Sequence, residues 1–117
     1  MLTRIAPEDV QKIDFVPQAI FNLPLTWFTD SPSAIRREVD DLDEFSVLYF
    51  SFNNKTIAVK AYKGFPEGTT SLYMDWSIKD EREITNTVHE FMSELSIPGD
   101  RLRWERQQGL PEQLVVP

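Results

Sequence analysis

The segment from residue 45 to residue 62 constrains the fold more than any other part of the chain. It holds two runs of strand-favouring residues, FSVLYFSF at 45–52 and KTIAVKAY at 55–62, with Asn53-Asn54 between them. Because asparagine tolerates the positive φ angles of a two-residue hairpin turn, this pattern predicts two antiparallel strands. In residues 72–78 apolar and polar residues alternate strictly, which predicts a third strand with Leu72, Met74 and Trp76 in the core.

Two helices are predicted around these strands. Residues 80–95 begin with Asp80, a favoured N-cap, and place five apolar residues in one helical stripe: Ile84, Val88, Phe91, Met92 and Leu95. Residues 31–42 begin with Ser31-Pro32 and repeat apolar residues at helical spacings, namely Ile35, Val39 and Leu42. Alternation in residues 101–107 predicts a further strand after the second helix, with Leu102 and Trp104 inward.

These elements predict an α+β fold, a two-layer sandwich in which two main helices pack on one face of an antiparallel sheet of four to five strands. The length of 117 residues suits a single domain covering 1–117. Residues 1–30, with Pro7, Pro17 and Pro24, are expected to form an irregular arm, and residues 108–117 a tail of unassigned structure. The order helix, three strands, helix, strand resembles that of secretion-chaperone sandwiches, which pair as dimers and hold extended partner segments.

Composition and charge exclude several classes of function. The chain has 12 basic and 19 acidic residues, a net charge of −7, which disfavours a protein that tracks a nucleic-acid backbone. It has no cysteine, so thiolate chemistry is excluded and the cytoplasm is the expected compartment. Neither a secretory signal nor a run of about 18 apolar residues is present, so no membrane role is expected. We expect no cofactor and no metal, because the chain lacks glycine-rich phosphate loops and glycine-containing acidic turns.

The sheet face opposite the helices carries the residues that we predict to bind a partner. Period-two alternation directs tyrosines and charged side chains to this face: Lys60, Tyr62, Tyr73, Asp75, Arg101 and Arg103. In residues 45–52 both alternating sets are apolar and only one can face the helices; Tyr49, in one of these sets, is included in the predicted binding residues. Tyrosine and arginine are enriched at the centres of protein interfaces. Two alternatives remain open. Either the N-terminal arm covers this face, or the face stays open and binds a protein partner or a second copy of the chain in a homodimer.

A second interpretation places an aromatic pocket between the N-terminal arm and the sheet. Phe21, Trp27 and Trp76 would line it, and His89, Asp75 or Arg103 would supply the polar group. Such a pocket suits a small enzyme or a ligand-binding domain. No serine, aspartate or glutamate stands at a recognised catalytic spacing to His89, the only histidine, so we assign no catalytic residue.

Acidic residues line the outward side of the helix predicted at 80–95: Glu83, Glu90 and Glu94. Such a stripe is typical of a solvated helix face, and it also suits contact with a basic partner. The sequence therefore predicts a small acidic protein-binding module, such as an adaptor, a chaperone-like protein or an inhibitor, that acts without catalysis through its open tyrosine- and arginine-bearing face.

Overall fold

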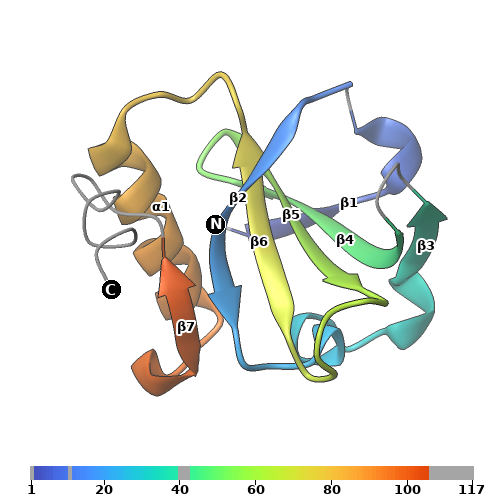
Figure 1. Ribbon diagram of the computed structural model, residues 1–117. Helices are drawn as coiled ribbons and strands as arrows, with labels where there is room; N and C mark the ends of the chain where they lie inside the picture. Colours follow the sequence, from blue (N-terminus) through green and yellow to red (C-terminus); the bar gives the residue numbers. More distant parts are fainter. Residues whose placement is uncertain (1, 11, 40–42, 106–117) are drawn as a thin grey trace.

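The computed structural model describes residues 2–10, 12–39 and 43–105, and within them the chain forms one antiparallel sheet of seven strands and one α-helix (Figure 1). The strands are β1 (Leu2–Ile5), β2 (Phe15–Phe21), β3 (Arg36–Val39), β4 (Glu44–Phe52), β5 (Lys55–Tyr62), β6 (Thr70–Asp75) and β7 (Leu102–Glu105). The helix is α1 (Glu81–Glu94). Short 3-10 turns in the connections are η1 (Pro7–Asp9), η2 (Leu25–Phe28), η3 (Pro32–Ala34) and η4 (Gly99–Arg101).

The sheet combines strands that are close in sequence with strands that are far apart. Its order is β1-β4-β5-β6-β2-β7, and β3 pairs with β4 beside this path. β5 pairs along β4 from Phe45 opposite Tyr62 to Phe52 opposite Lys55. The other edge of β4 is shared, because β1 pairs with residues 49–52 and β3 with residues 44–47. The meander β4-β5-β6 therefore forms the centre, and strands from both parts of the chain flank it.

The predicted hairpin is confirmed as β4 and β5. Asn53 and Asn54 have φ angles of 51° and 65°, the left-handed values that a two-residue turn of this kind requires. Alternate residues of the two strands lie in the core and are at most 4% exposed: Leu48, Phe50, Phe52, Ile57 and Val59. The local turn chemistry and the period of two were thus sufficient to define this part of the sheet.

The helix predicted at 80–95 is confirmed as α1. The Asp80 side chain caps it, because Oδ1 accepts hydrogen bonds from the backbone N–H groups of Arg82 at 3.0 Å and Glu83 at 3.4 Å. Four residues of the predicted stripe are buried, namely Ile84, Val88, Phe91 and Met92. Leu95, the C-cap, is half-buried.

Replacing Asp80 with alanine should lower the free energy of unfolding by about 1 kcal/mol, because two backbone N–H groups of α1 lose their acceptor. Urea unfolding followed by circular dichroism measures the difference. Asp80→Asn keeps a side-chain oxygen and is the matched control, expected to retain most of the stability. If the alanine variant is as stable as the unchanged chain, the cap does not stabilise α1.

The prediction of two helices on a sheet of four to five strands is wrong. The segment from residue 31 to residue 39 forms η3 and then β3, and residues 40–42 of the predicted helix lie outside the described residues. The helical pattern depended on three apolar positions, and a helix there would have gathered carboxylates at its negative C-terminal end. Pairing with β4 satisfies the backbone groups of β3 instead. The resemblance to secretion-chaperone sandwiches therefore does not hold.

The N-terminal arm is not irregular, because it contains β1 and β2. β2 lies inside the sheet, between β6 and β7. Pro17 has no N–H to donate, and the register of β2 on β6 shifts between Pro17 and Ala19. β7 pairs only with residues 19–21 of β2, so among the described residues Pro17 has a neighbouring strand, β6, on one side only. Gln18, at the β-bulge, is 1% exposed. The sheet consequently has more strands than predicted.

Trp76 does not lie in the core, contrary to the prediction, and is 56% exposed. β6 ends at Asp75, whose Oδ1 accepts a hydrogen bond from the Ser77 N–H at 2.8 Å and whose carbonyl accepts one from the Ile78 N–H at 3.1 Å. This turn ends the period-two alternation just before Trp76. Leu72 and Met74 precede the turn and are fully buried, as predicted.

The strand predicted at 101–107 corresponds to β7 over residues 102–105. Residues 106 and 107, together with the tail predicted at 108–117, lie outside the described residues. Arg101 belongs to η4 rather than to the strand. In the pairing of β7 with β2, Leu102 lies opposite Phe21 and Trp104 opposite Ile20, with an irregularity in the register between them. Leu102 and Trp104 therefore point to different faces of the sheet, and not both inward as predicted.

Each face of the sheet is covered by a different part of the chain. On the first, here called the helix face, α1 and η2 pack on the sheet, and Phe91 contacts the rings of Phe28 and Phe50. The second face carries a separate cluster of buried residues: Phe45, Val47, Tyr49, Ala58 and Tyr62. Ile5 and Val10 pack against this cluster. Residues 5–10 therefore form a cover on the second face, here called the N-terminal cover.

Candidate functional site

The structure gathers the three predicted tyrosines and Lys60 on the second face. Tyr49 and Tyr62 belong to its buried cluster, and Tyr73 packs against it. The Lys60 Nζ atom lies 4.5 Å from the Tyr73 ring centroid, 4.6 Å from that of Phe45 and 5.7 Å from that of Phe15. A cation over aromatic faces is attracted by the ring quadrupoles. Lys60 therefore links rings from β2, β4 and β6.

The N-terminal cover packs against the buried cluster of this face through Ile5 and Val10. Tyr49 is only 8% exposed, and Tyr62, whose ring contacts those of Phe45, Phe65 and Tyr73, is 9% exposed. Glu8 of η1 also pairs with Arg36 of β3 at 3.2 Å, which ties the cover to the edge of the sheet. Of the two alternatives left open by the sequence, coverage by the N-terminal segment is the one that this packing supports.

The Tyr49 hydroxyl is held in its protonated form. Burial raises its pKa above the usual value, and the Glu38 carboxylate raises it further by its charge and by accepting a hydrogen bond, while Arg36 acts in the opposite direction. A phenol with a raised pKa is neutral near pH 7 and donates a hydrogen bond rather than acting as a base. Tyr49 therefore links β4 to β3 through Glu38.

The other predicted binding residues lie apart from Lys60. Asp75 closes the turn after β6 through its hydrogen bond to Ser77. The Arg101 Nη1 donates to the Asn22 carbonyl at 3.3 Å and so fixes η4 next to the end of β2. Arg103 is exposed on β7, and β6 and β2 separate this strand from β5. The predicted set therefore does not form one continuous surface.

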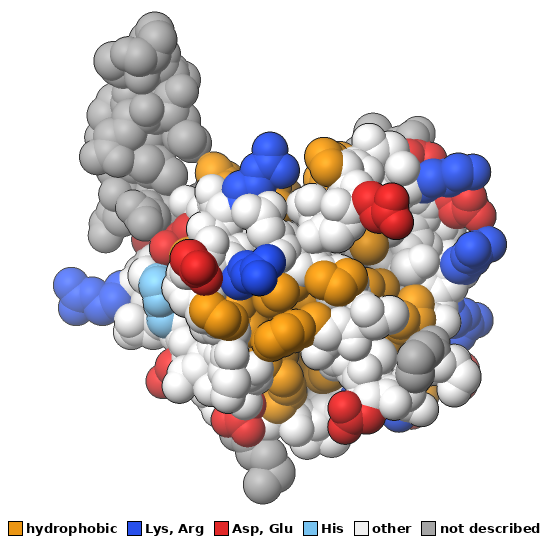
Figure 2. All heavy atoms as spheres, turned by 90° about the horizontal axis from the view of Figure 1, so that it is seen from below, with side chains coloured by type: hydrophobic (Ala, Val, Ile, Leu, Met, Phe, Trp, Pro, Cys, Tyr) orange, Lys and Arg blue, Asp and Glu red, His pale blue; other side chains and the backbone are white. Residues whose placement is uncertain are grey.

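The residues of the alternative aromatic pocket are spread over the molecule. Phe21 is buried in the core of the helix face, and Trp27 is 45% exposed in η2, at the lower end of Figure 1. Figure 2 views that end and shows hydrophobic side chains gathered at its centre. β2 and β6 pair from Phe21 opposite Thr70 at this end to Phe15 opposite Asp75 at the other, so Trp76 lies far from Trp27.

A cleft of about 630 Å3 does lie between the N-terminal segment and the sheet, at the Trp76 end. Residues 12–14 line one side, and residues 54–56 and 75–78 together with Glu83 line the rest. The Lys79 Nζ lies 2.9 Å from the Trp76 ring centroid, so the cation covers the exposed ring. Because Trp27 and His89 do not line this cleft, the predicted pocket is not assembled, and a ligand-binding role stays a prediction.

His89 connects α1 to the edge of the sheet. Its Nε2 lies 2.7 Å from Oε2 of Glu105 on β7, whose side chain is 7% exposed, while the His89 side chain is 54% exposed. A catalytic dyad would need a nucleophile within hydrogen-bond reach of the imidazole, and this arrangement offers a carboxylate instead. The pair holds β7 against α1.

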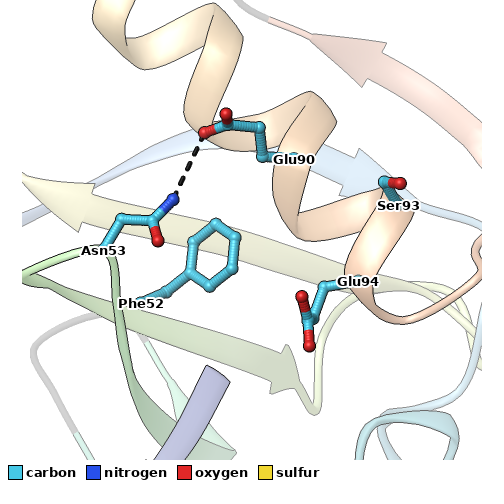
Figure 3. A pocket seen from close by; sticks show the side chains of 5 residues that line it. All are labelled: Phe52, Asn53, Glu90, Ser93 and Glu94. Carbon is cyan, nitrogen blue, oxygen red and sulfur yellow. Dashed lines mark hydrogen bonds between the residues drawn. The ribbon is translucent and has the colours of Figure 1, made fainter. Parts of the chain in front are cut away.

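A groove of about 450 Å3 lies between α1 and the tip of the β4–β5 hairpin (Figure 3). Its lining residues are Phe52, Asn53, Glu90, Ser93 and Glu94. Figure 3 shows the Phe52 ring pointing toward α1 between the two glutamates. The ring is 3% exposed and forms the floor. On one side the Asn53 Nδ2 donates to the Glu90 Oε1 at 3.3 Å.

The charges of this groove are unbalanced. Glu90 and Glu94 are four residues apart on α1, so two like charges lie on the same side of the helix and repel each other. They also lie toward the C-terminal end, where the helix dipole is negative, and the last turn contains no basic residue. Among the described residues, no lysine or arginine forms a salt bridge with either carboxylate. The groove therefore suits a cation from another molecule.

The sequence placed Glu90 and Glu94 on the outward side of a helix, but it did not identify Phe52 and Asn53 as their neighbours. The contact joins the tip of a hairpin to a helix much later in the chain, so no local pattern contains it. The available signal was the alternation in β4, which turns Phe50 and Phe52 to the face that α1 covers.

Comparisons with protein-family models, with curated proteins and with solved structures find no match. In residues 2–10, 12–39 and 43–105, histidine and carboxylate side chains do not gather in any group of three that could hold a metal ion. Within the same ranges, no helix combines the length and apolar character needed to cross a membrane. The candidate site therefore rests on its own geometry.

Proposed function

We propose that the chain is a non-catalytic protein-binding module that takes up a basic side chain of a protein partner in the groove between α1 and the β4–β5 hairpin. One observation carries the proposal: Glu90 and Glu94 flank the Phe52 ring, and no cation of the described residues pairs with either carboxylate. The net charge of −7 supports it, since a basic partner would be attracted over a long range and would encounter the groove faster.

Arginine fits this groove better than lysine. Its planar guanidinium carries five N–H donors, so one side chain can bond to both carboxylates, whereas the lysine ammonium is a point charge with three donors. The Ser93 hydroxyl and the Asn53 side chain supply further polar groups at the rim. Binding would also remove the repulsion between Glu90 and Glu94 that the free protein bears.

A tetra-arginine peptide titrated into the 15N-labelled chain should shift the backbone amide signals of Asn53 and of residues 90–94. Replacing both glutamates, Glu90→Gln with Glu94→Gln, should weaken binding at least about tenfold, equivalent to about 1.4 kcal/mol, because charge-assisted hydrogen bonds are lost. Heteronuclear NMR measures the sites and the Kd in one series.

The matched control is Glu67→Gln with Glu81→Gln, which removes the same charge at exposed positions elsewhere. At an ionic strength of about 0.15 M, where charges are screened beyond about 8 Å, this control should change the Kd by less than about threefold. Equal weakening by both pairs would show that only net charge matters. Binding without shifts at the groove would also contradict the proposal.

Stability separates loss of the site from loss of the fold. Glu94→Gln should raise the free energy of unfolding by about 0.3–1 kcal/mol, because repulsion with Glu90 and the unfavourable dipole contact both decrease. Urea unfolding of the same variant measures this. Weaker binding in a more stable protein identifies Glu94 as a residue that serves recognition.

A further inference from the structure

The outer edge of β3 is available for pairing. Within the described residues β3 pairs only with β4, so its other row of backbone N–H and C=O groups has no strand beside it. A free strand edge is a template for another strand. Arg36, Arg37 and Val39 are exposed, and Val39, at 75%, is the most exposed of the large hydrophobic residues in the described chain.

Faces of the sheet decide which pairings with a second copy are possible. Two antiparallel β3 strands related by a two-fold axis perpendicular to the sheet keep each face on the same side, so opposed residues must point to the same face. Arg36 and Glu38 lie opposite Val47 and Phe45, which belong to the cluster of the second face. Both therefore point to the second face. The alternate residues Ile35, Arg37 and Val39 point to the helix face.

One register makes β3 complementary to itself. With Arg37 opposite Arg37 of the second copy, Arg36 lies opposite Glu38, and Ile35 lies opposite Val39. Two ion pairs then form on the second face, in addition to the contacts of Arg36 with Glu8 and of Glu38 with Tyr49 within each chain. Two apolar pairs form on the helix face, where Ile35 already packs against the core. The registers that centre on Arg36 or on Glu38 place those like charges opposite themselves. The register centred on Arg37 also has one like-charged pair, Arg37 opposite Arg37, but it has two Arg36–Glu38 pairs of opposite charge beside it.

We propose that two copies of the chain associate through their β3 strands, antiparallel and in the register centred on Arg37, to form one continuous sheet. The contact is short and well below the standard interface area, so the Kd is expected between about 100 µM and 1 mM. The acidic groove lies at the Phe52 end of β4, whereas β3 pairs with the Glu44 end. The two surfaces can therefore be used at the same time.

Charge exchange tests the register. Arg36→Glu and Glu38→Arg each place like charges opposite each other in a pair of identical chains, so each variant should self-associate at least about tenfold more weakly. A mixture of the two variants joins unlike charges at both positions and should form a heterodimer at least as tight as the original pair. Sedimentation equilibrium to about 1 mM measures all three, and circular dichroism checks that each variant is folded.

Two further variants and the unchanged chain complete the experiment. Val39→Lys should weaken association, since it removes the apolar pair and adds a charge to the edge, while Trp76→Lys, at an exposed position distant from β3, should not. A chain that stays monomeric at about 1 mM overturns the proposal. Two further results would also overturn it: both charge variants associate as well as the unchanged chain, or their mixture associates no better than either variant alone. Either result would mean that the chains associate through another surface, or that another kind of partner binds the edge of β3.

Discussion

Replacing Phe91 with alanine should lower the free energy of unfolding by about 3–5 kcal/mol, the largest effect expected from any single substitution in this chain. Phe91 is fully buried at the centre of the inward side of α1. Its ring lies 6.2 Å from that of Phe28, and 6.0 Å from those of Phe50 and Phe52. Its removal leaves a cavity against β4 and η2, neither of which can move without breaking other contacts.

Urea unfolding of Phe91→Ala, read by tryptophan fluorescence and by circular dichroism, provides the measurement. The matched control is Trp76→Ala, another aromatic truncation, at a side chain that is 56% exposed. This control should change the free energy of unfolding by less than about 1 kcal/mol, since little area is lost from the core. A Phe91→Ala chain that loses less than the Trp76→Ala chain would show that α1 does not dock on the sheet as described.

Replacing Gln18 with methionine should raise the free energy of unfolding by about 1–2 kcal/mol, an effect of opposite sign. Gln18 is 1% exposed at the bulge of β2, and its Oε1 has no hydrogen-bond partner among the described residues. A buried acceptor without a partner retains the cost of leaving water. Methionine has a similar length and no such group, and its flexible side chain can adapt to the site.

Gln18→Glu is the control for this experiment. It keeps the shape of the side chain and adds a charge to the same buried position, so it should lower the free energy of unfolding by more than about 2 kcal/mol. Denaturant unfolding of the three chains in one buffer measures both changes. If methionine destabilises the chain by more than about 1 kcal/mol, the amide is bonded in solution, and the described environment of Gln18 is wrong.

Elements with strong local signals were predictable from the sequence. The Asn53-Asn54 turn and the alternation on either side of it define a hairpin without reference to the rest of the chain. Asp80 and the apolar stripe through Phe91 define α1 in the same way. In both cases the tertiary structure agrees with the local preference, so the prediction survives folding.

Elements defined by distant pairing were not predictable. Residues 36–39 have no strong preference for a strand and become β3 because an edge of β4 is available beside them. β2 contains Pro17, a residue that argues against an interior strand, and Pro17 lies outside residues 19–21, the part of β2 that pairs on both sides. The error at Trp76 has a local cause, since the Asp75 turn interrupts an alternation that the sequence continues.

The same division applies to the candidate site. Alternation along β5 and β6 directed Tyr62 and Tyr73 to one face, and the structure places Tyr49 at the same cluster, although both alternating sets of β4 are apolar. Whether that face was open depended on where residues 5–10 lie, which no periodicity contains. The groove likewise needs Phe52 and Glu94 to meet across the helix–sheet packing, and this contact exists only in three dimensions.

The interior position of β2 has a consequence for the rate and order of folding. The meander β4-β5-β6 closes through short loops, whereas β2 must pair with residues 70–75 and then with residues 102–105. Such non-local contacts raise the contact order and slow the search for the native topology. The meander can therefore form early as a nucleus, with the edge of β6 temporarily unpaired. Until β2 docks on that edge, an intermediate exposes both the edge of β6 and the apolar core surface that Phe21 contacts in the folded chain. This stage of folding is therefore the most prone to aggregation.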